Sequence, residues 1–211
     1  MTVEVKICGL NSREAVAAAV AGGARFLGFV FYPPSPRHVT PDEAAALAVA
    51  APAGVARVGL FVDADDAAIE ATLTAVGLDM LQLHGRETPA RVGAIKARFG
   101  KTVMKAVPLA GAADLDAAGA YLDAADWLLF DAKPPPHMSG ALPGGNALSF
   151  DWQLLAGRRW PRPWMLSGGL NTGNLPEAVH VSGATVVDVP SGVEDRPGAK
   201  SPHKIAAFLR V

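Results

Sequence analysis

The chain has 211 residues, of which 50% are hydrophobic, and this is enough for one domain spanning residues 1–211. Lysine and arginine total 19 against 20 aspartate and glutamate residues, so the net charge is -1. There is no basic block, which argues against nucleic acid or a membrane surface as partner and favours a small-molecule ligand. One cysteine excludes an internal disulfide, and the first residues do not resemble a signal peptide, so we expect a cytoplasmic protein.

Along the chain, short apolar runs alternate with alanine-rich helical stretches, which predicts strands separated by helices. This order requires parallel neighbouring strands, and eight such units favour a closed (β/α)8 TIM barrel over an open doubly wound sheet. The predicted strands are 3–8, 26–31, 55–62, 80–83, 102–107, 127–130, 164–166 and 186–189. Helix starts are predicted at or near Ser12, Pro41, Asp65, Thr88, Ala113, Asn171 or Thr172, and Ser201.

In a barrel of this kind, reactive groups gather at the C-terminal ends of the strands, whereas the interior is packed. The residue types found there are a thiol, carboxylates, an imidazole, a hydroxyl and a guanidinium. The candidates are Cys8, Arg37, Asp63, His84, Asp131, Ser167 and Asp188.

Several of these candidates have ordinary structural interpretations. A lone cysteine such as Cys8 is usually a small buried hydrophobe, and Asp63 is better interpreted as a helix cap. His84 could be a hydrogen-bonded rim residue, and no second histidine lies near enough in sequence to suggest a zinc motif. Asp131 ends an apolar run, where a desolvated carboxyl group would keep its proton near neutrality and could act as an acid.

Two glycine turns follow successive predicted strands within residues 164–194. Gly168 and Gly169 form the first turn, and Ser191 and Gly192 belong to the second. Such turns can direct backbone N–H groups to one point, which favours an anion, most often phosphate. The alternative is that the glycines only make tight turns, and the pattern leaves both interpretations open.

Two predicted loops, residues 133–147 and 32–40, could carry binding groups. Residues 133–147 are rich in proline and glycine, which excludes a helix or a strand and suggests either a lid or a surface excursion. The shorter loop 32–40 carries Arg37, whose guanidinium could either pair with a carboxylate or remain a solvated charge.

Taken in order, short motifs across the chain resemble those of the phosphoribosylanthranilate isomerase family. The resemblance runs from Val5 to about Gly198, and the order and spacing of the motifs make it specific. The motifs are VKICGL with Cys8, FYPPSPRHV with Arg37, LQLHG with His84, LLFDAK with Asp131, PGGN, LSGGLN and DVPSGVE.

The resemblance implies a (β/α)8 enzyme of tryptophan biosynthesis that needs no metal or organic cofactor. Its reaction would be the Amadori rearrangement of N-(5-phosphoribosyl)anthranilate to 1-(2-carboxyphenylamino)-1-deoxyribulose 5-phosphate. It further implies that Asp131 is the general acid, that Cys8 is the general base and that Arg37 binds the anthranilate carboxylate. The implied phosphate ligands are Gly168, Gly169, Ser191 and Gly192, and the implied lesser substrate contacts are His84 and Asp188.

These roles agree with the chemistry of the residue types. A thiol with an ordinary pKa of about 8.5 provides thiolate near neutral pH, and more of it beside donors that lower the pKa. Two positions depart from the family pattern. Pro190 replaces a usual serine and has no N–H for a phosphate, and Ala147 replaces a frequent glycine in the 133–147 loop.

Three alternatives remain for comparison. The related histidine-pathway phosphoribosyl isomerase has an aspartate where this chain has Cys8, which argues against it. A non-catalytic phosphosugar-binding barrel would lack Cys8 or Asp131, and a metal-assisted lyase or epimerase would need more histidine and carboxylate ligands. The amphipathic helices favour a monomer over a homodimer.

Overall fold

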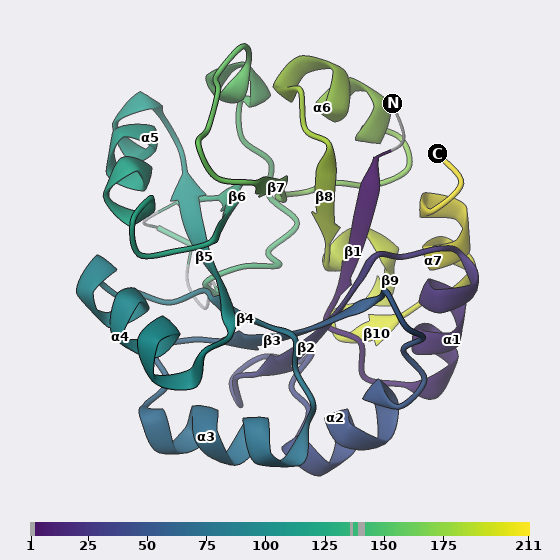
Figure 1. Ribbon diagram of the computed structural model, residues 1–211. Helices are drawn as coiled ribbons and strands as arrows, with labels where there is room; N and C mark the ends of the chain where they lie inside the picture. Colours follow the sequence, from purple (N-terminus) through teal and green to yellow (C-terminus); the bar gives the residue numbers. More distant parts are fainter. Residues whose placement is uncertain (1–2, 136, 139–141) are drawn as a thin grey trace.

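The computed structural model describes residues 3–135, 137–138 and 142–211. Its eight parallel strands form a closed barrel, because β8 pairs with β1 through Val5 and Val187 (Figure 1). Closure leaves no free strand edge in the barrel. The predicted (β/α)8 fold class is therefore confirmed. The strands are β1 (Glu4–Cys8), β2 (Phe26–Phe31), β3 (Ala56–Phe61), β4 (Met80–Leu83), β5 (Thr102–Leu109), β6 (Trp127–Ala132), β7 (Trp164–Leu166) and β8 (Val186–Val189).

The α-helices surround the barrel, and most begin at a capping side chain (Figure 1). Ser12 Oγ accepts a hydrogen bond from Ala15 N at 3.2 Å, and Thr40 and Glu43 cap each other reciprocally. These bonds satisfy backbone N–H groups that the first turn leaves free. The helices are α1 (Arg13–Ala21), α2 (Pro41–Ala48), α3 (Asp66–Ala75), α4 (Pro89–Phe99), α5 (Ala112–Ala118), α6 (Leu175–Ser182) and α7 (Pro202–Phe208).

The prediction that a helix separates every pair of strands is wrong for the connection between β6 and β7. Its described residues contain only the 3-10 turn η2 (Trp152–Leu155) and no α-helix. Aromatic side chains cover the barrel here instead, because the Trp160 and Trp164 rings lie 4.9 and 5.6 Å from the ring of Phe130. The proline- and glycine-rich sequence prevents a regular helix in the first half of this connection.

Two predicted helix caps are wrong. Asp65 caps α3, whereas Asp63 has a left-handed backbone with φ 49° and accepts a hydrogen bond from Arg86 N at 2.6 Å. Helix α6 begins only at Leu175, because Asn171 Oδ1 instead accepts from Gly173 N at 2.8 Å and forms a separate turn. Thr172 lies within that turn and is not a cap.

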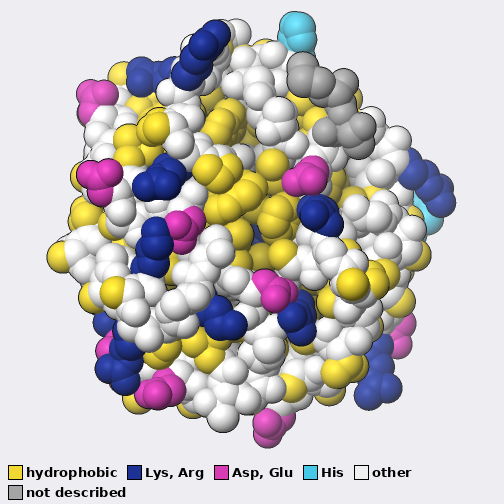
Figure 2. Space-filling view, viewed as in Figure 1, with side chains coloured by type: hydrophobic (Ala, Val, Ile, Leu, Met, Phe, Trp, Pro, Cys, Tyr) yellow, Lys and Arg dark blue, Asp and Glu magenta, His cyan; other side chains and the backbone are white. Residues whose placement is uncertain are grey.

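The side chains of the strands alternate between two layers. Val5 and Ile7 pack outward in the large core under the helices, whereas Lys6 and Cys8 share the inward face of β1. Figure 2 shows one face of the molecule, with hydrophobic side chains gathered at its centre and charges of both signs around them. The barrel interior is thus packed and leaves room for a ligand only at an end.

Two short elements extend beyond the barrel pattern near the C-terminus. Strands β9 (Glu194–Arg196) and β10 (Ala199–Lys200) form an antiparallel hairpin that follows the 3-10 turn η3 (Ser191–Val193). A third 3-10 turn, η1 (Gly119–Tyr121), follows α5. In the described part of the chain, no helix is both long enough and apolar enough to cross a membrane.

Candidate active site

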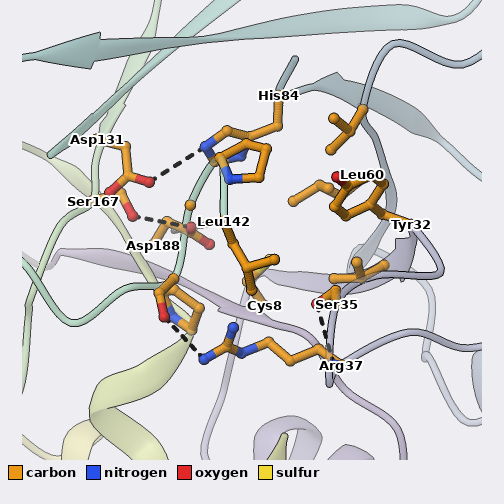
Figure 3. Close-up of a pocket in the computed structure, with 16 residues that line it drawn as sticks. Cys8, Tyr32, Ser35, Arg37, Leu60, His84, Asp131, Leu142, Ser167 and Asp188 are labelled. Atoms are coloured by element: carbon orange, nitrogen blue, oxygen red, sulfur yellow. Dashed lines mark hydrogen bonds and ion pairs between the residues drawn. The ribbon is translucent and has the colours of Figure 1, made fainter. Parts of the chain in front are cut away.

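A cavity lies at the C-terminal ends of the strands (Figure 3). The side chains labelled in Figure 3 come from β1, β3, β6 and β8 and from the loops after β2, β4, β6 and β7, so the fold gathers residues that are far apart in sequence. The predicted residues that line it are Cys8, Arg37, His84, Asp131, Ser167 and Asp188.

The thiol of Cys8 is buried at the end of β1 beside a buried ion pair. Lys6 Nζ donates to Asp188 Oδ1 at 2.8 Å, and Ser167 Oγ lies 3.3 Å from Asp188 Oδ2. Burial raises the pKa of Cys8, the Lys6 ammonium acts against this, and Asp188 adds to the increase. The Lys6 donor lowers this pKa as expected of a neighbouring donor, but desolvation of the thiolate outweighs it, so the net direction is upward.

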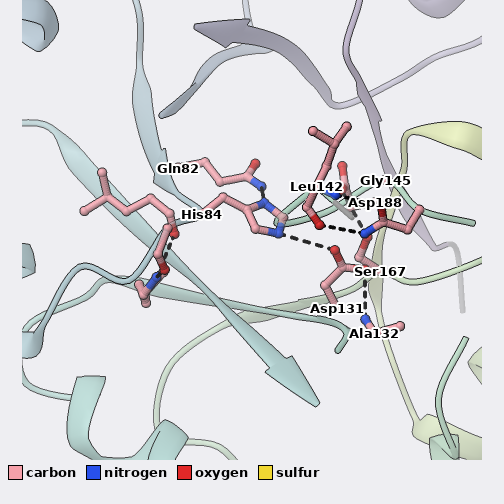
Figure 4. Close-up of polar contacts among 12 residues, drawn as sticks. Gln82, His84, Asp131, Ala132, Leu142, Gly145, Ser167 and Asp188 are labelled. Carbon is pink, nitrogen blue, oxygen red and sulfur yellow. Dashed lines mark hydrogen bonds and ion pairs between the residues drawn. The ribbon is translucent and has the colours of Figure 1, made fainter. Parts of the chain in front are cut away.

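The carboxyl group of Asp131 is the end of a chain of polar contacts (Figure 4). Its Oδ1 accepts from Ala132 N at 2.9 Å, and its Oδ2 lies 3.3 Å from His84 Nε2. His84 Nδ1 lies 3.0 Å from Gln82 Nε2. An amide nitrogen only donates, so Nδ1 accepts and the neutral imidazole carries its proton on Nε2, facing Asp131. Gln82 was not predicted; it lies on β4 two residues before His84, which places both on the same face.

A buried ion pair also supports the turn that carries His84. Lys105 Nζ donates to Glu87 Oε2 at 2.8 Å and to the carbonyl oxygens of Leu83 and Gly85 at 3.3 and 2.7 Å. Glu87 Oε2 in turn accepts from Gly85 N at 2.9 Å. These contacts hold the backbone on both sides of His84 in one conformation.

Arg37 is buried and is not a solvated charge. Its Nε and Nη2 donate to Glu194 Oε1 and Oε2 at 2.8 and 2.9 Å, which uses one whole edge of the guanidinium. Nη2 also donates to Gly145 O at 3.1 Å. The expected bidentate fork is thus occupied by the protein itself, and Nη1 is left facing the cavity. Glu194 was not predicted, because it lies 157 positions away from Arg37 in the sequence.

Glu194 belongs to a buried cluster on the β9–β10 hairpin. Lys200 Nζ donates to Glu194 Oε1 at 2.6 Å and to Pro190 O at 2.5 Å. Burial acts to raise the pKa of Glu194, but the hydrogen bonds from Arg37 and the Lys200 ammonium hold that pKa below its usual range. Burial lowers the pKa of Lys200 despite this carboxylate. Two cations and one carboxylate leave a net positive charge beside the cavity.

The predicted 133–147 loop passes directly over these groups, although its residues 136 and 139–141 lie outside the described residues. A Cβ atom at Gly144 would lie 2.6 Å from His84 Nε2 and 2.8 Å from Asp131 Oδ2. A Cβ atom at Gly145 would lie 2.6 Å from Arg37 Nη1. Glycine at both positions therefore lets the backbone approach the polar side chains.

The two departures from the family pattern both have local structural consequences. Ala147 has φ 58°, a left-handed conformation that glycine adopts without strain. Pro190 directly follows β8, and its carbonyl oxygen accepts a hydrogen bond from Lys200 Nζ. Pro190 has no N–H to donate, so its contact in the turn after β8 is made by its carbonyl oxygen, which accepts from Lys200 Nζ.

The two glycine turns lie side by side. Gly168, Gly169 and Ser191 line a second, smaller cavity, whereas Gly192 packs so closely on the carbonyl of Leu170 that any side chain there would overlap it. Gly168 and Gly169 have φ 92° and 64°, which explains the choice of glycine. The two cavities share Asp131, Gly145 and Pro190.

Within residues 3–135, 137–138 and 142–211, no group of three or more His, Cys, Asp or Glu side chains is arranged to hold a metal ion. The fold and the cavity define a barrel enzyme of small-molecule acid–base chemistry, because a thiol, a carboxyl group and an arginine meet at the strand ends.

Residues 5–211 match the family model described as N-(5'phosphoribosyl)anthranilate (PRA) isomerase. The chain therefore belongs to the phosphoribosylanthranilate isomerase family, as the motifs predicted. It is 65% identical to the N-(5'-phosphoribosyl)anthranilate isomerase of Rhodospirillum centenum over 209 residues, which cover 99% of this chain and 97% of the relative. It is 58% identical to that of Paramagnetospirillum magneticum over 210 residues, covering 100% and 97% of the two chains.

Solved structures give the same result. Phosphoribosyl anthranilate isomerase from Thermotoga maritima superposes with a TM-score of 0.87 at 36% identity, covering 99% of this chain and 98% of the other. Another isomerase structure, in complex with reduced 1-(o-carboxyphenylamino)-1-deoxyribulose 5-phosphate, gives 0.83 at 34% identity, with 99% and 97% covered. The chain is an enzyme that isomerises N-(5-phosphoribosyl)anthranilate in tryptophan biosynthesis.

Proposed function

We propose that the chain performs an Amadori rearrangement in which Asp131 is the general acid and Cys8 the general base. The observation that carries this assignment is that both groups are buried on one cavity, at the ends of strands β1 and β6. These strands lie on different sides of the barrel mouth. A sugar held between them can accept a proton at one atom and lose a proton at another.

The first step opens the ribose ring. Asp131 donates its proton to the ring oxygen, the bond between this oxygen and C1′ breaks, and the anthranilate nitrogen lone pair forms the C=N bond of an iminium ion. The carboxylate left on Asp131 accepts hydrogen bonds from Ala132 N–H and from His84 Nε2–H, which stabilises the product of the transfer.

The second step removes the proton on C2′. The Cys8 thiolate takes this proton, and the electron pair of the C–H bond forms the C1′=C2′ bond of a neutral enolamine. The enolamine becomes the ketone when the hydroxyl proton on C2′ is lost and C1′ is protonated. Cys8 finishes as a thiol and Asp131 as a carboxylate, so one proton returns between them through exchange with solvent.

The anthranilate carboxylate binds at Arg37. Nη1 of Arg37 faces the cavity. The cluster of Arg37, Glu194 and Lys200 carries a net positive charge beside the cavity. Since Glu194 occupies the other edge, the carboxylate contacts Nη1 first and reaches Nη2 only when Gly145 O gives way. His84 and Asp188, which line the same cavity, are lesser contacts of the substrate.

The phosphate group binds at the second cavity, through the turns that contain Gly168, Gly169, Ser191 and Gly192. Two observations support this assignment. The two turns contact each other, and the second cavity, which they line, adjoins the first cavity at Asp131. Backbone N–H groups at such turns bind anions without a charged side chain. Inorganic phosphate should therefore compete with the substrate, and Gly169→Val should weaken this competition strongly.

We further infer one domain over residues 1–211, a monomer and a cytoplasmic location. Exposed large hydrophobic side chains in the described residues are Val49, Met138 and Val211, which follow α2, lie in the 133–147 loop and end the chain, respectively. A related structure shows monomers generated from the isomerase of Thermotoga maritima, which is described as dimeric, so light scattering after gel filtration is a necessary test. A mass of 21.8 kDa is expected for the monomer.

The reaction itself is tested by mixing the purified chain with freshly prepared phosphoribosylanthranilate and following anthranilate fluorescence. Protein-dependent conversion to the carboxyphenylamino ketose, identified by mass and chromatography, is the expected result. Hydrolysis to free anthranilate at the rate of the buffer alone would reject the proposed function.

A further inference from the structure

The buried Lys6 lies on β1 two residues before Cys8, and the proposed mechanism assigns it no function. Lys6 is fully buried inside the barrel, on the inward face of β1 that also carries Cys8. Burying an ammonium group costs several kcal/mol unless it is paired, so its retention requires a reason. The pair with Asp188 explains how the charge is tolerated and does not explain what the charge does.

We propose that Lys6 is a positioning residue for Cys8. The ammonium group of Lys6 supplies the positive charge that stabilises the Cys8 thiolate, and Asp188 holds this ammonium in place. This inference rests on the proposed function of Cys8 as the base.

The first support is the position of the three groups. Lys6 is in register with Asp188 on β8, and Cys8 is in register with Gly28 on β2. A Cβ atom at Gly28 would lie 3.0 Å from Lys6 Nζ and 3.1 Å from Cys8 Sγ. Both polar atoms therefore border one small space that glycine leaves free. The two atoms are therefore no more than about 6 Å apart, and an opposite charge within about 4–6 Å favours ionisation of its neighbour.

The second support is the balance of charges around the thiol. Burial raises the pKa of Cys8, and the Lys6 ammonium is the strongest influence in the opposite direction, ahead of Lys200. Asp188 acts with burial and raises the pKa further. The ionisable groups that face the thiol from the elements around it are Lys6, Asp188, Arg37, His84, Asp131 and Lys200.

The third support is the state of Lys6 itself. Burial acts to lower its pKa, but the carboxylate of Asp188 and the thiol outweigh this, and the pKa of Lys6 is raised. Lys6 therefore carries its positive charge at neutral pH. Asp188 Oδ1 fixes the direction of the ammonium, and Asp188 Oδ2 is held by the Ser167 hydroxyl.

The chain offers a direct test because Cys8 is its only cysteine. Thiolate absorbance near 240 nm, measured against pH and corrected with Cys8→Ser as the blank, reports this one group. In Lys6→Met we expect about tenfold or more less thiolate at a given pH, the effect of losing one nearby opposite charge. Asp188→Asn removes the negative charge beside the thiol and keeps an oxygen that accepts from Lys6 Nζ, so it should raise the thiolate fraction.

A matched control is Lys96→Met, which breaks a lysine–aspartate pair with Asp126 at 2.6 Å away from the cavity. It should leave the thiol titration unchanged. Since Lys6→Met leaves Asp188 buried and unpaired, it is accompanied by Lys6→Met/Asp188→Asn, which removes both charges. The double variant should still show less thiolate than the wild type, because Lys6 has the larger influence of the two.

Thiolate fractions equal to the wild type in both Lys6 variants would overturn the proposal, as would a shift in the same direction for Lys6→Met and Asp188→Asn. The proposed function is tested separately by the turnover of Cys8→Ser. Normal turnover of Cys8→Ser with the expected titrations would reject Cys8 as the base and leave its link to Lys6 intact. Inactive Cys8→Ser with unchanged titrations would reject the role of Lys6 alone.

Discussion

Glu194→Gln tests whether Arg37 is held in place for the substrate carboxylate. The substitution keeps the size of the side chain and removes the charge that Arg37 and Lys200 share. Both cations remain buried, and only one acceptor oxygen remains between them.

The size of the effect follows from the three buried hydrogen bonds at 2.8, 2.9 and 2.6 Å. Breaking a buried ion pair costs about 3–5 kcal/mol, and the remaining amide oxygen recovers part of it, so the free energy of unfolding should fall by about 2–3 kcal/mol. A misplaced Arg37 loses one charge-assisted hydrogen bond to the substrate, about 1.5–3 kcal/mol, which raises KM about 10- to 150-fold. The value of kcat should change little, because Cys8 and Asp131 lie on other elements.

The same cluster makes the stability difference depend on pH. The pKa of Glu194 is lowered in the folded state, so its stabilising contribution is present above the unfolded glutamate pKa of about 4.3. This contribution is lost as the pH falls through the lowered folded pKa. The gap in unfolding free energy between wild type and Glu194→Gln should therefore be largest near neutrality and shrink below about pH 4.

Steady-state fluorescence assays give KM and kcat, and denaturant titrations give the free energy of unfolding. The control is Asp79→Asn, which breaks a similar arginine fork, with Arg57 at 2.9 and 3.0 Å, in a more exposed place. This variant should lose no more than about 1 kcal/mol and keep its KM. An unchanged KM in Glu194→Gln would refute the claim that Glu194 orients Arg37 for the substrate.

Three further variants test the surroundings of the acid. Gly144→Ala should lower kcat about tenfold, because the added methyl group displaces His84 and Asp131 from their contact. Steady-state kinetics measure this loss of kcat. An unchanged kcat would show that the loop moves and makes room for the methyl group. Gln82→Leu should lower kcat about tenfold at constant KM and alter its pH profile, because the imidazole tautomer is no longer fixed. Ala147→Gly should raise the free energy of unfolding by roughly 0.5–1 kcal/mol, since it relieves a left-handed backbone, and a loss of stability in denaturant would contradict this.

The barrel could be predicted from the sequence because each strand is a short apolar run and each break carries turn or cap residues. Strands 26–31, 80–83, 164–166 and 186–189 were predicted with their observed bounds. The β9–β10 hairpin was missed because its strands have three and two residues, too few for any alternation to be visible.

The errors at helix starts have a common cause. Asp63 and Asp65 are both acceptable caps by residue type, and only the path of the backbone decides between them. At α6 too the backbone path decides, because Asn171 forms a turn of its own and Asn174, which directly precedes the helix, makes no side-chain cap bond. Local propensity does not reveal which of several nearby polar residues directly precedes a helix.

The supporting residues of the site were harder to predict than the motif residues. Glu194 and Lys200 act on Arg37 across a large sequence separation, which no local pattern reports. Lys6 could have been found, because in a barrel covered by helices the polar side of an alternating strand faces inward. The alternation that predicted β1 therefore already placed Lys6 beside Cys8.

The most direct test of the proposed mechanism compares turnover of phosphoribosylanthranilate by the wild type, Cys8→Ser, Asp131→Asn and the double variant. A serine hydroxyl supplies essentially no anion at neutral pH, and an asparagine has no acidic proton to donate, so each single variant should lose about a hundredfold or more in kcat with little change in KM. The double variant should lose little beyond the worse single one, because the two groups act in one sequence. Near-normal turnover of Cys8→Ser would contradict this mechanism and indicate Asp188 as the next candidate for the base.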